Sequence, residues 1–177
     1  QRKNEMYLDV HEFWKAILQE VVDPETETVL ISSYGLYAGI SDTGENTALR
    51  YNFNRPHQMI LDQSNAGKRI IMLISESDPM ECVQGCQHCK EKTEKRDDRL
   101  QAHVAHWPNI SWHLTRDHHL KAILIKKSDG RVVGFSGGRN FTTSEWTDVS
   151  FRLSEEDAKE LLIYLVGKIQ TKAGKLN

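Results

Sequence analysis

The chain has 177 residues, of which 38% are apolar and 27% charged, and its formal net charge at pH 7 is −2. This length and composition fit one soluble domain with a substantial core, and they leave little room for two domains. No stretch contains the roughly 18 consecutive apolar residues of a membrane span, and the N-terminus lacks the pattern of a signal peptide. We therefore expect a cytoplasmic protein without membrane contacts, organised as a single domain over residues 1–177.

Charge is distributed unevenly along the chain. Residues 1–28 carry three basic and seven acidic side chains, whereas residues 113–140 carry six basic and two acidic ones. A local excess of positive charge attracts phosphate groups even when the whole protein is mildly acidic. The sequence therefore permits the second segment to bind a polyanion such as a nucleic acid.

The first half of the chain predicts helices alternating with buried strands. Apolar residues at helical spacing indicate a helix over residues 5–20. A β-branched and apolar run over residues 28–40 then meets glycines, which is typical of a buried strand that ends in a loop. A second helix is expected over residues 45–66, with a break or kink at Arg55-Pro56.

A β-α-β unit follows from the next segments. Gly67 ends the second helix, and residues 69–75 (RIIMLIS) form a short, continuous apolar run, as in a strand that is buried on both faces of a sheet. A polar, cysteine-containing insertion is expected at about residues 78–99, and residues 94–106 are expected to form a helix.

The second half predicts further strands, a hairpin and a final helix. Strands are expected, in chain order, at residues 110–114, 120–125, 131–135 and 149–153. Asp129-Gly130 between two of them suits a type I′ turn. Ser154 is expected to cap a helix over residues 155–170. The fold class is therefore α/β, with a mixed, mostly parallel β-sheet flanked by helices.

The residues with the clearest chemical potential are His119 and Lys121. They stand two residues apart at the start of a predicted strand, so strand alternation places both side chains on one face. Such a pair by itself is more often merely solvated. The loop after the hairpin adds weight, because Ser136 and Gly138 are small enough for backbone to approach a ligand and Asn140 supplies an amide.

This arrangement resembles the signature of the phospholipase D superfamily, which is H-x-K, a short strand with an acidic residue, and then G-S-x-N. The matching residues are His119-Leu120-Lys121 and Gly137-Gly138-Arg139-Asn140. The order of predicted elements over roughly residues 28–165 is similar to one whole half of a superfamily member. One motif in a short chain resembles the nuclease branch, in which two chains pair and bring two histidines together.

Two positions depart from the family pattern. The acidic residue expected five positions after the lysine is Lys126 here, and the nearest candidate, Asp129, lies in the predicted turn. The family serine is replaced by Gly138, for which Ser136 or backbone N–H groups are the alternatives. Alternation points the neighbouring His118 to the other face, where we expect it to be a core or surface residue.

The resemblance implies a metal-independent phosphodiesterase that forms a covalent phosphohistidine. His119 would be the nucleophile, and the partner's His119 would protonate the leaving oxygen. Lys121 and Asn140 would stabilise the charged phosphorus centre. The acidic residue that orients the histidine in family nucleases has its best match in Asp148, with Glu145 as the alternative.

We therefore expect a homodimeric endonuclease that acts on DNA or RNA and needs no cofactor for catalysis. One alternative is a hydrolase of phospholipids or other small phosphodiesters, which would need an apolar docking surface that the sequence does not reveal. The other alternative is a non-catalytic regulatory or binding module, which the displaced acid and the missing serine would fit.

The three cysteines, Cys82, Cys86 and Cys89, are odd in number and too clustered for the disulfide framework of a secreted protein. Three thiolates need only one further ligand to hold a structural Zn²⁺, and His103 or His106 on the predicted helix could supply it. Free thiols in a loop and an oxidised Cys82–Cys86 pair are the alternatives.

Overall fold

The computed structural model describes residues 4–33, 55–75, 105, 107–115, 118–137 and 149–175. Its strands are β1 (Glu5–Tyr7), β2 (Thr26–Ser33), β3 (Arg69–Ser75), β4 (Ile110–Thr115), β5 (Ala122–Lys127), β6 (Val132–Gly137) and β7 (Ser150–Arg152). Its helices are α1 (Val10–Val22), α2 (Arg55–Asp62), the 3₁₀ turn η2 (Gln63–Ala66) and α4 (Glu155–Lys175). The strands form one sheet in the order β1-β7-β6-β5-β2-β3-β4.

The sheet is mixed, but most of its pairings are antiparallel. Parallel pairing joins β2 to β3 and β3 to β4, whereas β1–β7, β7–β6, β6–β5 and β5–β2 are antiparallel. The expectation of a mostly parallel sheet is therefore wrong. The predicted β-α-β unit, β2-α2-β3, is confirmed, but it does not extend through the sheet, because a hairpin such as β5–β6 necessarily adds an antiparallel strand.

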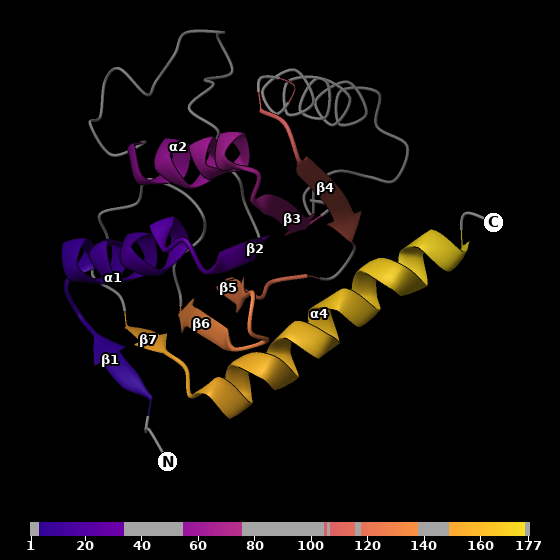
Figure 1. Cartoon of the computed structure of the whole chain (residues 1–177). Coiled ribbons are helices and arrows are strands. Elements are labelled where there is room, and N and C mark those ends of the chain that lie inside the picture. The colour runs from indigo at the N-terminus through magenta and orange to yellow at the C-terminus, as the bar shows by residue number, and fades with distance from the viewer. Residues whose placement is uncertain are drawn as a thin grey trace, which may run out of the picture.

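Strand alternation divides the core into two layers. Val29 and Ile31 of β2 pack on the face that α1 and α2 cover. Leu30 of β2 and Leu124 of β5 pack with Leu165 of α4 on the other face. Figure 1 shows this arrangement, with α1 and α2 on one side of the sheet and α4 running across the other. The continuous apolar runs seen in the sequence fit strands that helices cover on both faces.

The N-terminal segment differs from the sequence expectation. Apolar spacing predicts a helix from residue 5 onward, but Glu5–Tyr7 forms β1, which pairs with β7. The helix α1 begins only after Asp9, whose carboxylate accepts hydrogen bonds from the backbone N–H groups of His11 and Glu12. An N-cap inside the apolar pattern therefore sets the start of the helix.

The β5–β6 hairpin closes with a different turn from the one predicted. The Gly130 N–H donates to the Lys127 carbonyl over 3.0 Å, and the Lys127 N–H donates to the Arg131 carbonyl over 2.8 Å. Gly130 has a φ of 90°, whereas Asp129 is not among the described residues with positive φ. A type I turn followed by a left-handed glycine therefore replaces the type I′ turn.

Two of the predicted helix ends agree with the structure. Gly67 follows η2 with a φ of 86°, as a left-handed C-cap does. At the start of α4, the Asp157 N–H donates to Ser154 Oγ over 3.2 Å, which confirms the serine cap. Pro56 lies in the first turn of α2, where a missing N–H is tolerated. Residues 45–54, the cysteine-rich insertion at 78–99 and the helix expected at 94–106, apart from residue 105, lie outside the described residues.

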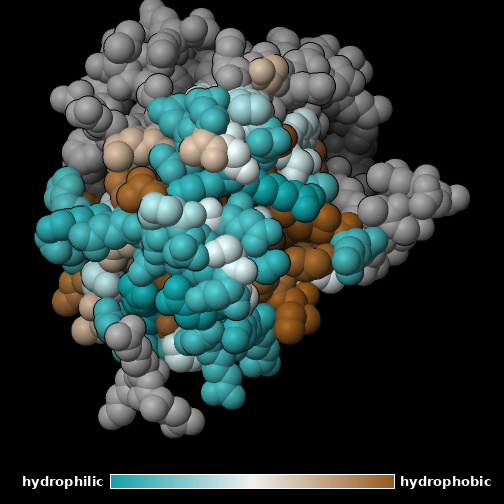
Figure 2. All heavy atoms as spheres, viewed as in Figure 1, coloured by the Kyte–Doolittle hydropathy of each residue, from teal (hydrophilic) through white to brown (hydrophobic). Residues whose placement is uncertain are grey.

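The described surface is mostly hydrophilic on the face that Figure 2 shows, with apolar atoms gathered over the middle of α4. On that helix, Ile163 and Tyr164 are 74% and 55% exposed. None of the helices that the structure describes is long and apolar enough to cross a membrane.

Candidate active site

The H-x-K motif lies just before β5, at the end of the sheet where β2 and β6 finish. Ala122, the first residue of β5, is paired with Ser32 of β2 on one side and with Ser136 of β6 on the other. His119 and Lys121 belong to the short lead-in, residues 118–121, that precedes the strand. Polar side chains from three neighbouring segments therefore converge at this edge.

Lys121 contacts His119 directly. Its Nζ lies 2.9 Å from His119 Nδ1 and 3.4 Å from Nε2, and it also donates to the His119 carbonyl over 3.1 Å. An ammonium group can only donate, so a hydrogen bond to the ring would need an unprotonated ring nitrogen as its acceptor. Lys121 is buried and His119 is exposed. The two side chains of the motif are therefore in contact, with His119 accessible at the surface.

Two serine hydroxyls hold the backbone of this segment. Ser32 Oγ donates to the Leu120 carbonyl over 2.7 Å, and Ser136 Oγ donates to the Lys121 carbonyl over 2.9 Å. A hydroxyl has only one proton, so Ser136 has none left to offer a phosphate in this arrangement. The Ser136 hydroxyl therefore holds the Lys121 carbonyl, and its role as a phosphate ligand stays a prediction.

His118 lies on the opposite side of the segment from its neighbour. It is 3% exposed, its Nε2 lies 2.6 Å from Ser32 Oγ, and its Nδ1 lies 3.3 Å from Lys168 Nζ of α4. Burial, the Lys168 ammonium and then His119 lower the pKa of His118 to about 4. Alternation predicts this core position, but it gives no hint of the polar partners.

Ser32 and Lys168 are therefore site residues that the sequence reasoning missed. The two serines that end β2, directly after the apolar run at residues 29–31, are a signal that could have pointed to Ser32. Lys168 carries no such signal, because a single lysine in a long helix is ordinary and helical spacing does not reveal its partner.

Gly137 has a structural reason to be small. A Cβ added there would lie 2.7 Å from the Val149 carbonyl oxygen and 2.8 Å from Ser150 Oγ. The missing side chain thus lets β7 approach β6 at the edge where the motif lies. The remaining expected site residues lie outside the described residues: Gly138, Asn140, Asp148 and the alternative Glu145, together with the candidate zinc ligands Cys82, Cys86, Cys89, His103 and His106.

Asp129 does not reach the motif. It lies in the hairpin turn, where its carboxylate pairs with Arg131 over 2.7 Å. Hydrogen bonds from the Arg131 backbone and side chain lower the pKa of Asp129. The length of β5, about 17 Å for six residues, separates this turn from His119. Lys126, which takes the family's acidic position, is exposed on β5.

A second charged cluster lies at that far end of the sheet. Lys127 is 1% exposed and forms ion pairs with Glu20 over 2.8 Å and with Asp23 over 2.9 Å. Lys68 Nζ donates to the backbone carbonyls of Val21 over 2.6 Å and of Asp23 over 2.9 Å. These ammonium groups satisfy carbonyls at the C-terminal end of α1, where the helix dipole favours cations. The cluster anchors α1 to the sheet.

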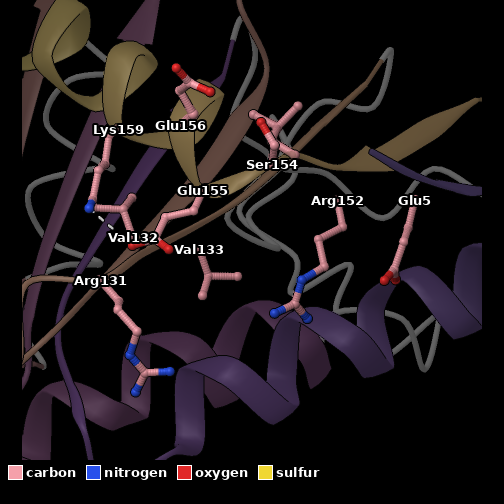
Figure 3. A pocket seen from close by; sticks show the side chains of 10 residues that line it. Glu5, Arg131, Val132, Val133, Arg152, Ser154, Glu155, Glu156 and Lys159 are labelled. Atoms are coloured by element: carbon pink, nitrogen blue, oxygen red, sulfur yellow. Dashed lines mark ion pairs between the residues drawn. The ribbon is translucent and has the colours of Figure 1, made fainter. Parts of the chain in front are cut away.

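A pocket of about 540 Å³ opens between the starts of β6 and α4 and the end of β7 (Figure 3). Its charged lining residues are Arg131, Arg152, Lys159, Glu5, Glu155 and Glu156. Lys159 pairs with Glu155 over 3.1 Å. Balanced charge, and a position at the opposite end of β6 from Ser136, make this pocket a poor match for a phosphate site.

The fold of this chain was compared with those of known proteins. No protein-family model matches the chain, and no curated protein matches its sequence. The phosphatidylserine synthase of Haemophilus influenzae aligns with a TM-score of 0.51 at 14% identity, over 94% of this chain and 38% of that protein. The archaeal chromatin protein TrmBL2, whose structure shows a novel mode of DNA binding, aligns with a TM-score of 0.50 at 6% identity, over 96% of this chain and 53% of that protein.

Yeast tyrosyl-DNA phosphodiesterase aligns more loosely, with a TM-score of 0.42 at 13% identity, over 84% of this chain and 31% of that protein. The chain therefore spans about half, or less, of the length of these proteins. The likeness of the chain to phosphatidylserine synthase and TrmBL2 therefore concerns the fold alone.

Proposed function

We propose that this chain is a metal-independent phosphodiesterase of the single-motif phospholipase D type, and that it works as a homodimeric endonuclease on DNA or RNA. The observation that carries the proposal is the 2.9 Å contact between Lys121 Nζ and His119 Nδ1, at an exposed edge of a phospholipase D-like fold. The two residues of the motif are in contact, and the nucleophile candidate is accessible.

The chemistry begins with a neutral imidazole, because the lone pair of a His119 ring nitrogen must form the new P–N bond while the bond to the leaving oxygen breaks. An anionic phosphate oxygen accepts a hydrogen bond more strongly than an imidazole nitrogen does. Lys121 would therefore transfer its hydrogen bond from the ring to the substrate. That transfer frees the ring and stabilises the charge that develops on phosphorus.

The leaving oxygen needs a proton, which we assign to the partner's His119 as an imidazolium. Water then attacks the phosphohistidine, the P–N bond breaks, and the second histidine takes the proton from water. Asn140, the Gly138 N–H and Ser136 would bind phosphate oxygens, and Asp148 would orient the histidine pair. Asn140 matches the family motif and Asp148 matches the later acidic residue of family nucleases, whereas Ser136 and the Gly138 N–H are alternatives for the family serine that this chain lacks.

The position of the apolar surface favours a nuclease over a lipid hydrolase. Leu120 packs in the layer beneath α4, so alternation directs His119 and Lys121 to the other face of the sheet. The exposed Ile163 and Tyr164 lie on α4, which covers the opposite face of the sheet from these two side chains. The basic segment gives weaker support than its composition indicates, since its Lys127 and Arg131 are paired with carboxylates.

The decisive experiment offers the purified chain four kinds of substrate in EDTA: end-labelled DNA, end-labelled RNA, phosphatidylserine vesicles and bis(p-nitrophenyl) phosphate. Cleavage of nucleic acid by the wild-type chain, and its loss in His119→Ala, would support the proposal. Turnover of vesicles alone would favour the lipid alternative. Tight binding of DNA without turnover of any substrate would favour a non-catalytic module, and an absolute requirement for Mg²⁺ would point to another mechanism.

A further inference from the structure

A hydrogen-bond chain runs on the α4 side of the sheet, behind the motif. It begins at Lys168 Nζ, which lies 3.3 Å from His118 Nδ1. His118 Nε2 then lies 2.6 Å from Ser32 Oγ, and Ser32 Oγ lies 2.7 Å from the carbonyl oxygen of Leu120. His118 and Ser32 are 3% and 2% exposed. The chain thus connects α4, through buried groups, to the residue between His119 and Lys121.

The chemistry of its two ends fixes the direction of this chain. An ammonium group can only donate a hydrogen bond, and a carbonyl oxygen can only accept one. His118 Nδ1 must therefore be unprotonated, so the neutral ring carries its proton on Nε2 and donates to Ser32. Ser32 passes its single proton to the Leu120 carbonyl. Only one tautomer of His118 satisfies every member.

The electrostatics of the site favour the same state. Burial, followed by the Lys168 ammonium and by His119, lowers the pKa of His118, so its ring is neutral at pH 7. A second ring proton on Nδ1 would face the Lys168 ammonium and break the chain at its first step.

The carbonyl at the end of the hydrogen-bond chain belongs to the lead-in before β5, outside the strands that the structure describes. Residues 118–121 precede β5, and the hydroxyls of Ser32 and Ser136 grip the Leu120 and Lys121 carbonyls on either side. A rotation of the Leu120 peptide would change the directions of the His119 and Lys121 side chains together. A buried polar chain that is fully satisfied resists such a rotation.

We propose that Lys168, His118 and Ser32 are positioning residues, which fix the backbone of the motif from the opposite face of the sheet and couple α4 to the candidate active site. The catalytic part of this inference rests on the proposed phosphodiesterase function. The coupling of His118 to His119 through the hydrogen-bond chain does not rest on that function, so the coupling and the catalytic role can be tested separately.

The first test follows the ring signals of ¹⁵N-histidine-labelled protein by NMR at pH 7. The wild-type His118 should be neutral with its proton on Nε2. Lys168→Met and Ser32→Ala should each shift the ring signals of both His118 and His119. Lys159→Met on the exposed part of α4 and Ser64→Ala, a buried serine whose Oγ has no partner among the described residues, are the matched controls and should leave both signals unchanged. An Nδ1-protonated or charged His118, or a His119 signal that ignores Lys168→Met, would overturn the inference.

The second test measures steady-state hydrolysis of bis(p-nitrophenyl) phosphate. Lys168→Met and Ser32→Ala should lower kcat by roughly 10- to 100-fold with KM almost unchanged, because a misdirected His119 still binds substrate but reacts slowly. His118→Gln keeps one donor and one acceptor and should retain more kcat than His118→Leu. Wild-type kcat in folded Lys168→Met would overturn the positioning role. A wild-type chain without turnover would reject the proposed function instead, and the NMR result would then decide the coupling alone.

Discussion

Lys121 Nζ lies 2.9 Å from His119 Nδ1, so the side chain two residues further along is in direct contact with the candidate nucleophile. In the proposed reaction, the Lys121 ammonium that would stabilise the charge on phosphorus already lies beside the His119 imidazole that would attack it. The consequence can be tested at each residue.

His119→Ala should abolish turnover without unfolding the chain, since the side chain is exposed and adds little to the core. Lys121→Met should keep the buried methylene stem and lower kcat by on the order of 10²–10³. Lys126→Met, an exposed lysine on the same strand, is the matched control and should keep full activity. Steady-state kinetics beside circular dichroism would check this, and folded His119→Ala with more than a few per cent of activity would reject His119 as nucleophile.

The cluster at the other end of the sheet should matter for stability alone. Lys127→Met removes the cation that pairs with Glu20 and Asp23, and leaves these two carboxylates and the end of α1 without their buried partner. We expect the free energy of unfolding to fall by roughly 2–4 kcal/mol, as measured by urea denaturation. Lys126→Met should change it by less than about 0.5 kcal/mol. An equal effect of the two substitutions would mean that the ion pairs contribute nothing.

The fold was predictable from sequence where local patterns decide the structure. The strand Arg69–Ser75 has the predicted bounds, since a continuous apolar run directly follows the Gly67 cap. The start of α1 was not predictable from spacing, because Met6 fits the helical pattern although the Asp9 cap comes after it. The direction of the strands depends on pairings between distant segments, which periodicity does not report.

The candidate site divides in the same way. Strand alternation placed His119 beside Lys121 and turned His118 away from them, because these relations span one or two residues. The partners of His118 come from 86 and 50 residues away, and no local pattern specifies such contacts. Sequence reasoning therefore finds the motif and misses the side chains behind it.

The buried His118 predicts how stability depends on pH. Its pKa is about 4 in the folded chain and 6.5 in its ordinary state, so the unfolded chain binds this proton first as the pH falls. Stability should be fully present above pH 6.5 and should decline toward pH 4, by on the order of 1–3 kcal/mol. Lys168 and His119 are the charged and titratable groups that act electrostatically on the ring.

A comparison of variants isolates this contribution. His118→Gln should flatten the decline between pH 6.5 and 4, whereas His11→Gln, at an exposed position, should leave it unchanged. Urea denaturation at several pH values measures both. Losses from carboxylates such as Asp23, whose pKa is lowered chiefly by its Lys127 hydrogen bond, occur in every variant and cancel in the difference. Identical slopes for wild type and His118→Gln would contradict the buried neutral histidine.

We also propose that Cys82, Cys86 and Cys89 hold one structural Zn²⁺, with His103 or His106 as the fourth ligand. Elemental analysis should find about one zinc per chain. Stripping it should lower the melting temperature more than it lowers kcat, because the proposed chemistry does not pass through the metal. His103→Ala and His106→Ala would show which histidine binds, and an unchanged melting temperature for metal-free protein would exclude the site.

The last prediction concerns assembly. One H-x-K motif supplies one histidine per chain, while the proposed reaction needs a nucleophile and a separate acid on opposite sides of phosphorus. A two-fold interface around the motif would bring His119 and the partner's His119 to a shared phosphate. Chains carrying His119→Ala, mixed in excess with wild-type chains, should then suppress activity in proportion to the mixed dimers formed, whereas excess His11→Ala chains should not. A wild-type chain that sediments as an active monomer and ignores the mutant would place the acid in the same chain, with His113 of β4 and His118 the first candidates to replace.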